Sequence, residues 1–373
     1  MASASSISAA RRRGIRTRKV PARRKALGRA IMWGAFLLLV VLTALQTLDS
    51  AGIIAIGFGN WRPVLYGYCI WAVAVCVGQV MTRGEKGYRA LFVLPAVLFT
   101  LAVTIFPTIS ALYIAMLDWN LSSARGPHFI GLGNFVAMFH DTSYWNAMSN
   151  MVFYLLAVLF EYAIAFGLAL LLNADIRARK FFRVSFLLPF MLSPVAVSWM
   201  IGKSLMEYRF GPIARLARDL GWQTPAFFAH PWTARIAIEA MDGWMWIPFM
   251  IILLLAGLQA MPKEVLEAAR VDGANGWHLF WRVIFPLMLP VSITTLVIRI
   301  IFKLKLADIV INVTAGGPGG ATDTVSSFIY RVYADRSNVG YGTALAVFYL
   351  IAIIILLTVI LYGSRRWMRT ANG

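Results

Sequence analysis

Long apolar runs alternate with shorter polar segments along most of the chain. A membrane-spanning helix needs about 20 mostly apolar residues, and eight runs are long enough to qualify. They cover residues 31–48, 63–81, 90–112, 149–172, 184–203, 236–258, 287–304 and 342–362. Backbone groups in lipid must form hydrogen bonds within their own segment, so each run is expected to be a helix. The pattern therefore predicts an all-α polytopic membrane protein with eight transmembrane helices.

The composition supports this class. Of the 373 residues, 60% are hydrophobic and only 14% are charged, whereas a soluble domain carries roughly 25% charged residues. A soluble globule cannot hide so much apolar surface. A soluble enzyme and a disordered chain are both excluded.

Basic residues gather between alternate helices, which predicts the orientation. Of the 35 Lys and Arg residues, 23 fall in the five segments expected inside the cell: 1–30, 82–89, 174–183, 259–286 and 363–373. The chain is expected in the inner (plasma) membrane of a bacterial cell. The positive-inside rule then places both of its termini in the cytoplasm. The first run follows a basic stretch, as in a signal peptide, but it is long enough to remain as an anchor. The net charge of +19 follows from topology and anionic lipid, so no nucleic-acid partner is expected.

The longest segment expected inside contains an acidic amphipathic helix. Pro262 suits a first helical turn, and Glu264 and Glu267 lie one turn apart. Ala268 and Ala269 are small, so another surface can approach the helix closely. The segment is predicted either to dock into a partner or to lie flat on lipid. Lipid-surface helices favour basic faces, so the acidic residues favour docking.

A turn and an aromatic second helix follow. Gly273 stands where a sharp turn or left-handed cap is needed. The second piece presents aromatic and aliphatic side chains, and two prolines are expected to begin the next membrane helix. These residues are Trp277, Phe280, Trp281, Ile284, Pro286 and Pro290.

This segment resembles the EAA loop of ABC importer permeases, here over residues 261–290. The resemblance is carried by Glu267-Ala268-Ala269, then Asp272-Gly273-Ala274, and then Pro286 and Pro290. The second triplet is similar to the carbohydrate-type (maltose-like) subfamily. Further similar segments follow the order found in that subfamily. They are Leu117–Asn120, Gly131–Phe135, Gly167–Asn173, Ala307–Asp308 with Thr314–Pro318 and Thr322, and Gly340–Ala346.

The resemblance implies a domain organisation. A six-helix permease core would occupy residues 90–363, and 31–89 would supply two extra helices. Residues 1–30 and 364–373 would be basic cytoplasmic tails.

The resemblance also implies partners. The first loop helix would seat in a cleft of a cytoplasmic ATPase, with Glu264, Glu267, Ala268, Ala269, Asp272, Gly273 and Ala274 as the coupling residues. ATP and Mg would be bound by two ATPase subunits and no cofactor by this chain. A second, different permease subunit, an extracytoplasmic solute-binding protein and a small-molecule carbohydrate complete the expected set. The binding protein would meet segments 113–148, 204–235 and 305–341.

Charged residues within membrane helices are costly and are usually functional. Candidates for the translocation pathway are Glu161, Glu239, Asp242, Arg299 and Asp308. The structural alternative is that Glu161 pairs with Arg299 or a polar neighbour and that Lys303 extends outward to the interface. Aromatic faces that could stack on a sugar are Trp199, Trp244, Trp246 and Phe302. Each of these could equally serve packing or interfacial anchoring.

No catalytic constellation is visible. Gly202-Lys203-Ser204 lacks the first glycine of a P-loop, because Val197 stands there. The four histidines have no metal spacing. The expected function is ATP-driven import of a sugar or polyol by a transport subunit that is not itself an enzyme. Alternatives are the same machinery for glycerol phosphate or a sugar derivative, an ion-coupled secondary transporter, and a membrane scaffold or enzyme.

Overall fold

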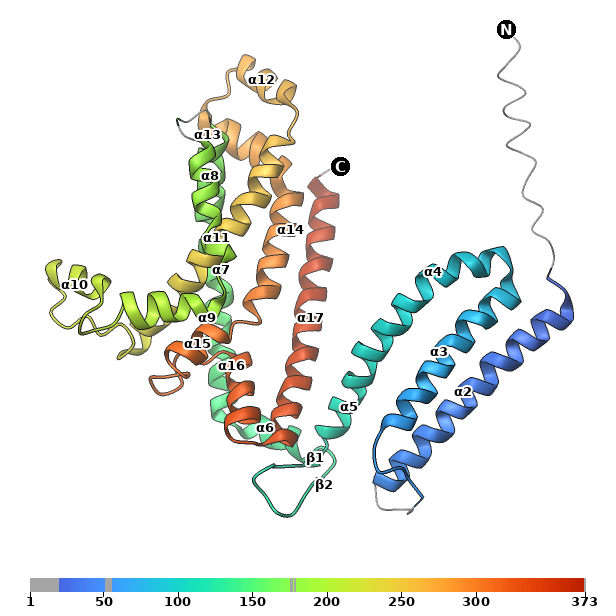
Figure 1. The fold of residues 1–373 in the computed structure, drawn as a ribbon. Helices are drawn as coiled ribbons and strands as arrows, with labels where there is room; N and C mark the ends of the chain where they lie inside the picture. Colours follow the sequence, from blue (N-terminus) through green and yellow to red (C-terminus); the bar gives the residue numbers. More distant parts are fainter. Residues whose placement is uncertain (1–19, 51–55, 175–176, 178, 372–373) are drawn as a thin grey trace, which may run out of the picture. The chain divides into compact units, whose positions relative to one another are not determined.

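A computed structural model describes residues 20–50, 56–174, 177 and 179–371 (Figure 1). The chain divides into two compact units, Met1–Ser110 and Ala111–Gly373. The division falls within the third apolar run. Each unit has its own helical packing and is described separately.

The first unit is a set of long helices arranged side by side. Its helices are α2 (Ala22–Ser50), α3 (Arg62–Arg83) and α4 (Glu85–Thr100), which continues through the π-helical η1 (Leu101–Ile105) into the first part of α5 (Phe106–Ile114). Gly84 has φ +57° and reverses the chain between α3 and α4, a conformation that glycine adopts without strain.

Glycines set the close approach of α2 and α3. Gly28 and Gly78 are both buried. A Cβ added at Gly78 would lie 2.3 Å from Met32 Cγ and 3.0 Å from the Gly28 carbonyl oxygen. Small residues allow such contacts between membrane helices.

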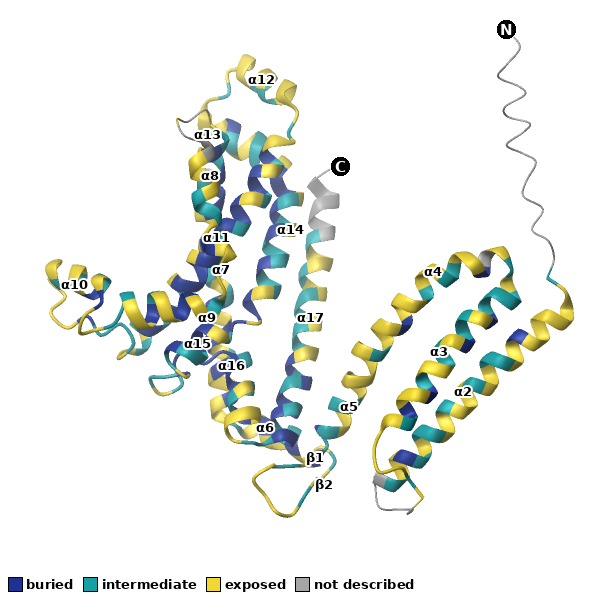
Figure 2. Ribbon diagram, in the orientation of Figure 1, coloured by how far each residue is buried: buried dark blue, intermediate teal, exposed yellow. Residues whose placement is uncertain are grey.

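The second unit is built around α11 (Pro231–Gln259). This helix packs on α7 (Thr142–Asn173) and on α14 (Phe285–Lys303). In the apolar 18-residue stretch of α11, 56% of the residues are buried, whereas only 6% are buried in the corresponding stretch of α2. Figure 2 shows the same contrast between α11 and the mostly exposed α2 and α4. The last long helix is α17 (Val339–Ala371), which packs against α14.

Short elements connect the long helices of the second unit. A two-stranded antiparallel ribbon pairs Leu117 with Phe129 and Asp118 with His128. The two strands of the ribbon are β1 (Leu117–Asp118) and β2 (His128–Phe129). The other connecting elements are α6 (Gly133–His140), α10 (Pro212–Asp219), α15 (Asp308–Val313), α16 (Val325–Tyr330) and η5 (Arg331–Asp335).

The run 184–203, predicted to be one helix, is broken, because the chain bends by 100° in the middle of that run. Leu192 and Ser193 have extended backbone, and the Ser193 hydroxyl caps the next helix by accepting from Ala196 N. Proline disfavours helical conformation in the residue before it, so Pro194 explains the break. The elements on either side are α8 (Arg179–Leu187), η2 (Pro189–Met191), α9 (Pro194–Val197) and the π-helical η3 (Ser198–Leu205).

The other seven apolar runs each lie within one long helix. Among the described residues, seven helices are long and apolar enough to span a membrane, or eight if the bent pair is one span.

The loop between α11 and α14 has the helix–turn–helix form expected from its sequence. α12 (Lys263–Val271) is followed by Gly273 at φ +81° and then by α13 (Gly276–Leu279). Pro286 lies in the first turn of α14, as predicted, whereas Pro290 lies inside that helix. The π-helical η4 (Phe280–Ile284) joins α13 to α14, and Phe285 N bonds back to Phe280 O. A π turn changes the hydrogen-bond pattern locally without ending a helix.

The helix packing in the first unit gives a stability prediction. We expect Gly78→Leu to lower the thermal unfolding temperature, because an overpacked contact costs about 1–3 kcal/mol. Gly34 lies on the same helix pair with nothing within 4 Å of an added Cβ. Gly34→Leu should therefore leave the unfolding temperature unchanged or raise it slightly. Circular dichroism of the purified chains during heating measures both, and equal effects of the two substitutions would refute the packing assignment.

Candidate functional site

Five charged side chains from three helices converge in the core of the second unit. We call them the ion cluster: Glu161 of α7, Glu239 and Asp242 of α11, and Arg299 and Lys303 of α14. Residues three or four apart share one helix face. The spacing of the α11 and α14 pairs therefore directs both members of each pair toward α7.

Arg299 joins all three helices. Its Nε lies 2.6 Å from Glu161 Oε2, and its Nη2 lies 2.7 Å from Glu161 Oε1. The same Nη2 also bonds to Asp242 Oδ2. The side chain has no exposed surface. A guanidinium with two flat N–H edges is well suited to such paired contacts.

Lys303 occupies the centre of the three carboxylates. Its Nζ lies 3.0 Å from Glu161 Oε1, 2.5 Å from Glu239 Oε2 and 2.6 Å from Asp242 Oδ2. The outward extension considered for Lys303 is wrong, because its side chain is completely buried.

The ion cluster leaves little need for a metal. Oxygen atoms of Glu161, Glu239 and Asp242 lie within 4.8 Å of one another, a spacing that could hold a cation. The Lys303 ammonium already contacts one oxygen of each. Three carboxylates against two cations leave a formal charge of −1 on the cluster.

An aromatic recess of about 190 Å³ adjoins the ion cluster. Trp246 and Phe302 form one wall, with ring centroids 4.3 Å apart. The Arg299 guanidinium lies 5.3 Å from the Trp246 ring centroid. The recess is lined by Pro194, Asp242, Met245, Trp246, Phe302, Lys305, Leu306, Ala307, Asp308 and Ile309.

The structure therefore separates the predicted pathway residues into three groups. Trp246, Phe302 and Asp308 line the recess, Glu161, Glu239 and Arg299 belong to the ion cluster, and Asp242 belongs to both. Trp199 and Trp244 do not line the recess, and their exposed fractions are 58% and 41%.

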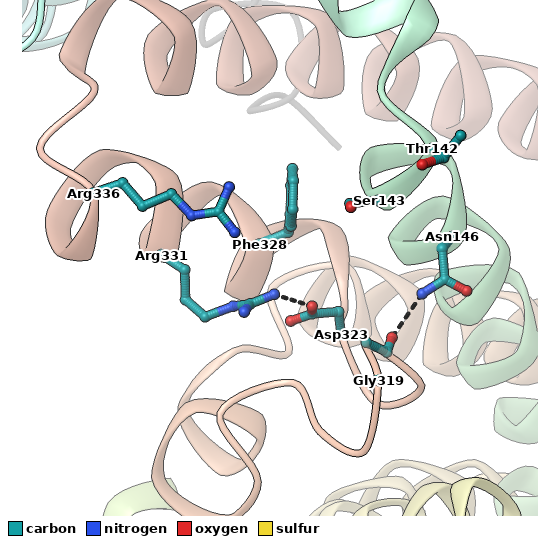
Figure 3. A pocket seen from close by; sticks show the side chains of 9 residues that line it. Thr142, Ser143, Asn146, Gly319, Asp323, Phe328, Arg331 and Arg336 are labelled. Carbon is teal, nitrogen blue, oxygen red and sulfur yellow. Dashed lines mark hydrogen bonds and ion pairs between the residues drawn. The ribbon is translucent and has the colours of Figure 1, made fainter.

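A polar pocket of about 410 Å³ lies at the N-terminal end of α7 (Figure 3). We call it the Asn146 pocket. Ser143 and Asn146 of α7 face Arg331 and Arg336 across it, and Asp323 pairs with Arg331 at its base. Burial raises the pKa of the Asp323 carboxyl, and Arg331 counteracts that rise. About 22 Å of helix separates Asn146 from Glu161 at 1.5 Å per residue.

Sequence reasoning missed a network that fixes the glycine-rich turn beside this pocket. Asn146 Nδ2 and Asn150 Nδ2 both donate to Gly320 O, at 2.7 and 2.9 Å. Arg235 of α11 donates to Asn150 Oδ1 and to Ala321 O, both at 2.7 Å. The signal was present, since two asparagines four apart in an apolar helix share a face.

The predicted coupling residues lie on an exposed helix. None of the α12 side chains is buried. Glu264, Glu267 and Ala268 are exposed, whereas Ala269 is half-buried. Gly273 N bonds to Arg270 O at 3.1 Å and Ala274 N to Ala269 O at 2.9 Å, which closes the turn. The structure places the coupling residues together but brings them no partner from the described part of this chain.

The similarity to a known protein family lies within the second unit of the chain. Residues 130–370 match the family described as binding-protein-dependent transport system inner membrane component. The sulfoquinovosyl glycerol transport system permease protein SmoG of Agrobacterium fabrum is 32% identical over 265 residues, covering 71% of this chain and 86% of that protein. The trehalose/maltose transport system permease protein MalF of Thermococcus litoralis is 31% identical over 266 residues, covering 71% and 88%.

Solved structures share the fold. A bacterial ABC transporter involved in import of the acidic polysaccharide alginate aligns with TM-score 0.66 and 23% identity, over 75% of this chain and 95% of that one. The alginate transporter in complex with a pentasaccharide-bound periplasmic protein aligns with TM-score 0.65 and 21% identity, over 83% and 98%.

These findings define a class, the membrane-embedded component of a binding-protein-dependent importer. The chain belongs to the binding-protein-dependent transport system inner membrane component family. It is a multi-pass inner-membrane permease subunit of a carbohydrate-type ABC importer, as the sequence resemblance implied. Members of this family are transport components, so the chain is not an enzyme.

The ion cluster gives the second prediction. Removing one partner from a buried ion pair costs about 3–5 kcal/mol, since the other charge stays buried and unpaired. We expect Arg299→Leu to lower the unfolding temperature of the purified chain markedly.

Arg125 is the matched control, because it is exposed and surface changes usually stay within about 0.5 kcal/mol. Differential scanning fluorimetry of Arg299→Leu and Arg125→Leu compares the two. An unchanged melting temperature for Arg299→Leu would contradict the role of the cluster in stability.

Proposed function

We propose that this chain carries a neutral carbohydrate or polyol inward through its second unit. Transport would be powered by ATP hydrolysed on partner subunits. The observation that supports the solute class is the aromatic recess beside the ion cluster. The rings of Trp246 and Phe302, tilted by 31° to each other, offer an apolar face, and Asp242 and Asp308 offer hydrogen-bond acceptors. Small-molecule sites commonly combine apolar walls with a few placed polar groups.

Charge favours a neutral solute over an anionic one. The recess adds Asp308 and Lys305 to the ion cluster, so the combined formal charge stays at −1. Both cations of the cluster are buried and already bonded to carboxylates. An anion entering the recess would therefore meet uncompensated negative charge, which costs energy at low dielectric.

The relatives include proteins named for neutral sugars and proteins named for an organic phosphate. MalF of Thermococcus litoralis is named for trehalose and maltose, and a permease of Agrobacterium fabrum is named for sn-glycerol 3-phosphate. An organic phosphate or a sugar derivative is therefore the second candidate solute.

The coupling proposal rests on α12. A helix with no buried side chain and small residues on its surface is suited to dock in a partner's groove. Glu267 would meet a basic group of a cytoplasmic ATPase, and Ala268 and Ala269 would allow close seating. ATP and Mg would then bind on two ATPase subunits, and a second permease would complete the membrane assembly.

The Asn146 pocket supports the proposed position of the solute-binding protein. It lies on the segments 113–148 and 305–341 that were expected outside, far along α7 from the ion cluster. Both termini would then face the cytoplasm, together with α12. A periplasmic protein is bound to the related alginate transporter, and the polar Asn146 pocket offers a comparable partner hydrogen-bonding groups.

The recess gives a test of the solute class. Trp246→Ala should raise the solute concentration for half-maximal uptake roughly tenfold, because an aromatic wall is lost. Uptake of maltose and of sn-glycerol 3-phosphate by vesicles with the full transporter measures this.

Trp199→Ala is the matched control and should leave uptake unchanged, since Trp199 lies outside the recess. Efficient uptake of glycerol phosphate, with none of any neutral sugar tried, would reverse the proposed preference.

The coupling helix gives a separate test. Glu267→Lys and Gly273→Pro should each abolish ATP-dependent uptake while membrane insertion stays normal. The first reverses a charge at the docking surface, and the second forbids the φ of +81° at the turn. Uptake in vesicles and the amount of chain in the membrane fraction are measured together.

Glu85→Lys serves as the charge-reversal control, because Glu85 is also exposed but begins α4 in the first unit. Normal uptake by both loop variants would rule out the coupling role. Uptake that continues without ATP would favour an ion-coupled transporter instead.

A further inference from the structure

The first unit contains an apolar groove that the transport proposal does not use. It has a volume of about 620 Å³ and lies between α2, α3 and the segment formed by η1 and α5. Its walls include Leu39, Leu65, Trp71, Ile105 and Phe106. Leu65, Ile105 and Phe106 are each about half exposed, so the groove is open at its side. In a membrane such a surface must be covered by an apolar group.

One cation lies at an end of this groove. Arg62, in the first turn of α3, is the charged residue among those that line it. Within the described part of the chain, no carboxylate forms an ion pair with Arg62. Trp61 lies next to it and also lines the groove. Tryptophan and arginine together are typical of the membrane–water interface.

The length of the groove matches one leaflet of a bilayer. Its α3 wall extends from Arg62 to Trp71, nine helical steps that rise about 14 Å at 1.5 Å each. The hydrocarbon core of a bilayer is about 30 Å thick, so one leaflet is about 15 Å. An occupant anchored at Arg62 would therefore reach roughly to the middle of the membrane.

We propose that this groove binds one acyl chain of a membrane phospholipid whose phosphate is held by Arg62. The chain fills the apolar walls, and the phosphate supplies the anion that the guanidinium lacks. A phosphate accepts paired hydrogen bonds from arginine. A helix of a protein partner would fill the same walls but would leave Arg62 without a counter-charge unless it also brought a carboxylate.

The test is native mass spectrometry of the full chain, purified in mild detergent and supplied with phosphatidylglycerol or with phosphatidylcholine. Both lipids carry the phosphate, so each should be retained as a single adduct. Arg62→Gln should reduce the retained fraction about fivefold for both lipids, the effect of about one interfacial basic group. Arg62→Lys should restore most of it.

Two further variants separate specific from general lipid binding. Arg89→Gln removes another exposed arginine of the first unit that does not line the groove, and it should retain the adduct. Ala102→Trp places a large side chain in the groove and should remove the adduct while circular dichroism shows intact helices.

Equal retention by Arg62→Gln and the unaltered chain would overturn the proposal. So would retention by the isolated chain combined with loss from the assembled transporter, because a protein helix would then occupy the groove. Retention of phosphatidylglycerol alone would also overturn it, since net headgroup charge rather than phosphate would be recognised.

Discussion

A buried cluster of five charges holds the central helices of this permease together. Arg299 and Lys303 of α14 contact carboxylates from α7 and α11, and both side chains are completely buried. Charges are expensive in a membrane unless they are paired. The pairing therefore fixes the relative rotation of three helices, because turning any one of them would leave a buried charge alone. The aromatic recess depends on this arrangement, since Trp246 and Phe302 lie on α11 and α14 next to the cluster.

The helices joined by the ion cluster also connect the two ends of the second unit, the loop that contains α12 and the turn that contains Gly320. α11 leads directly into the exposed α12, and α14 continues back through η4 and α13 to the same loop. A force applied to the loop would thus reach helices that are joined by the ion cluster. At the other end, Arg235 of α11 and Asn150 of α7 fix the turn that contains Gly320. This gives the proposed docking surfaces a rigid connection, which is the physical requirement for driving two states with ATP.

The sequence predicted the features that depend on local pattern. Hydropathy located seven of the long helices, and the acidic helix with Gly273 predicted the exposed turn before α13. Ser193 and Pro194 are a local signal for the bend, but the hydropathy pattern did not reveal it because the apolar run continues across both residues. The ion cluster was only partly predictable. Pairing of Glu161 with Arg299 was one of the alternatives that the cost of buried charge suggested, whereas the central position of Lys303 depends on how three helices cross. The contacts of Arg235 and Asn150 with the Gly320 turn join residues far apart in sequence, so no local pattern specified them.

The central claim is that α7, α11 and α14 move as one body while α12 transmits the action of an ATPase. The most direct measurement is a pair of cryo-electron microscopy structures of the assembled transporter in a bilayer disc, without nucleotide and with a non-hydrolysable ATP analogue. The account predicts α12 seated in an ATPase cleft in both states. It also predicts that the contacts of Arg299 and Lys303 with Glu161 and Asp242 stay intact while the helices rotate together. An α12 that faces lipid or solvent in both states, or a cluster that separates between them, would contradict it.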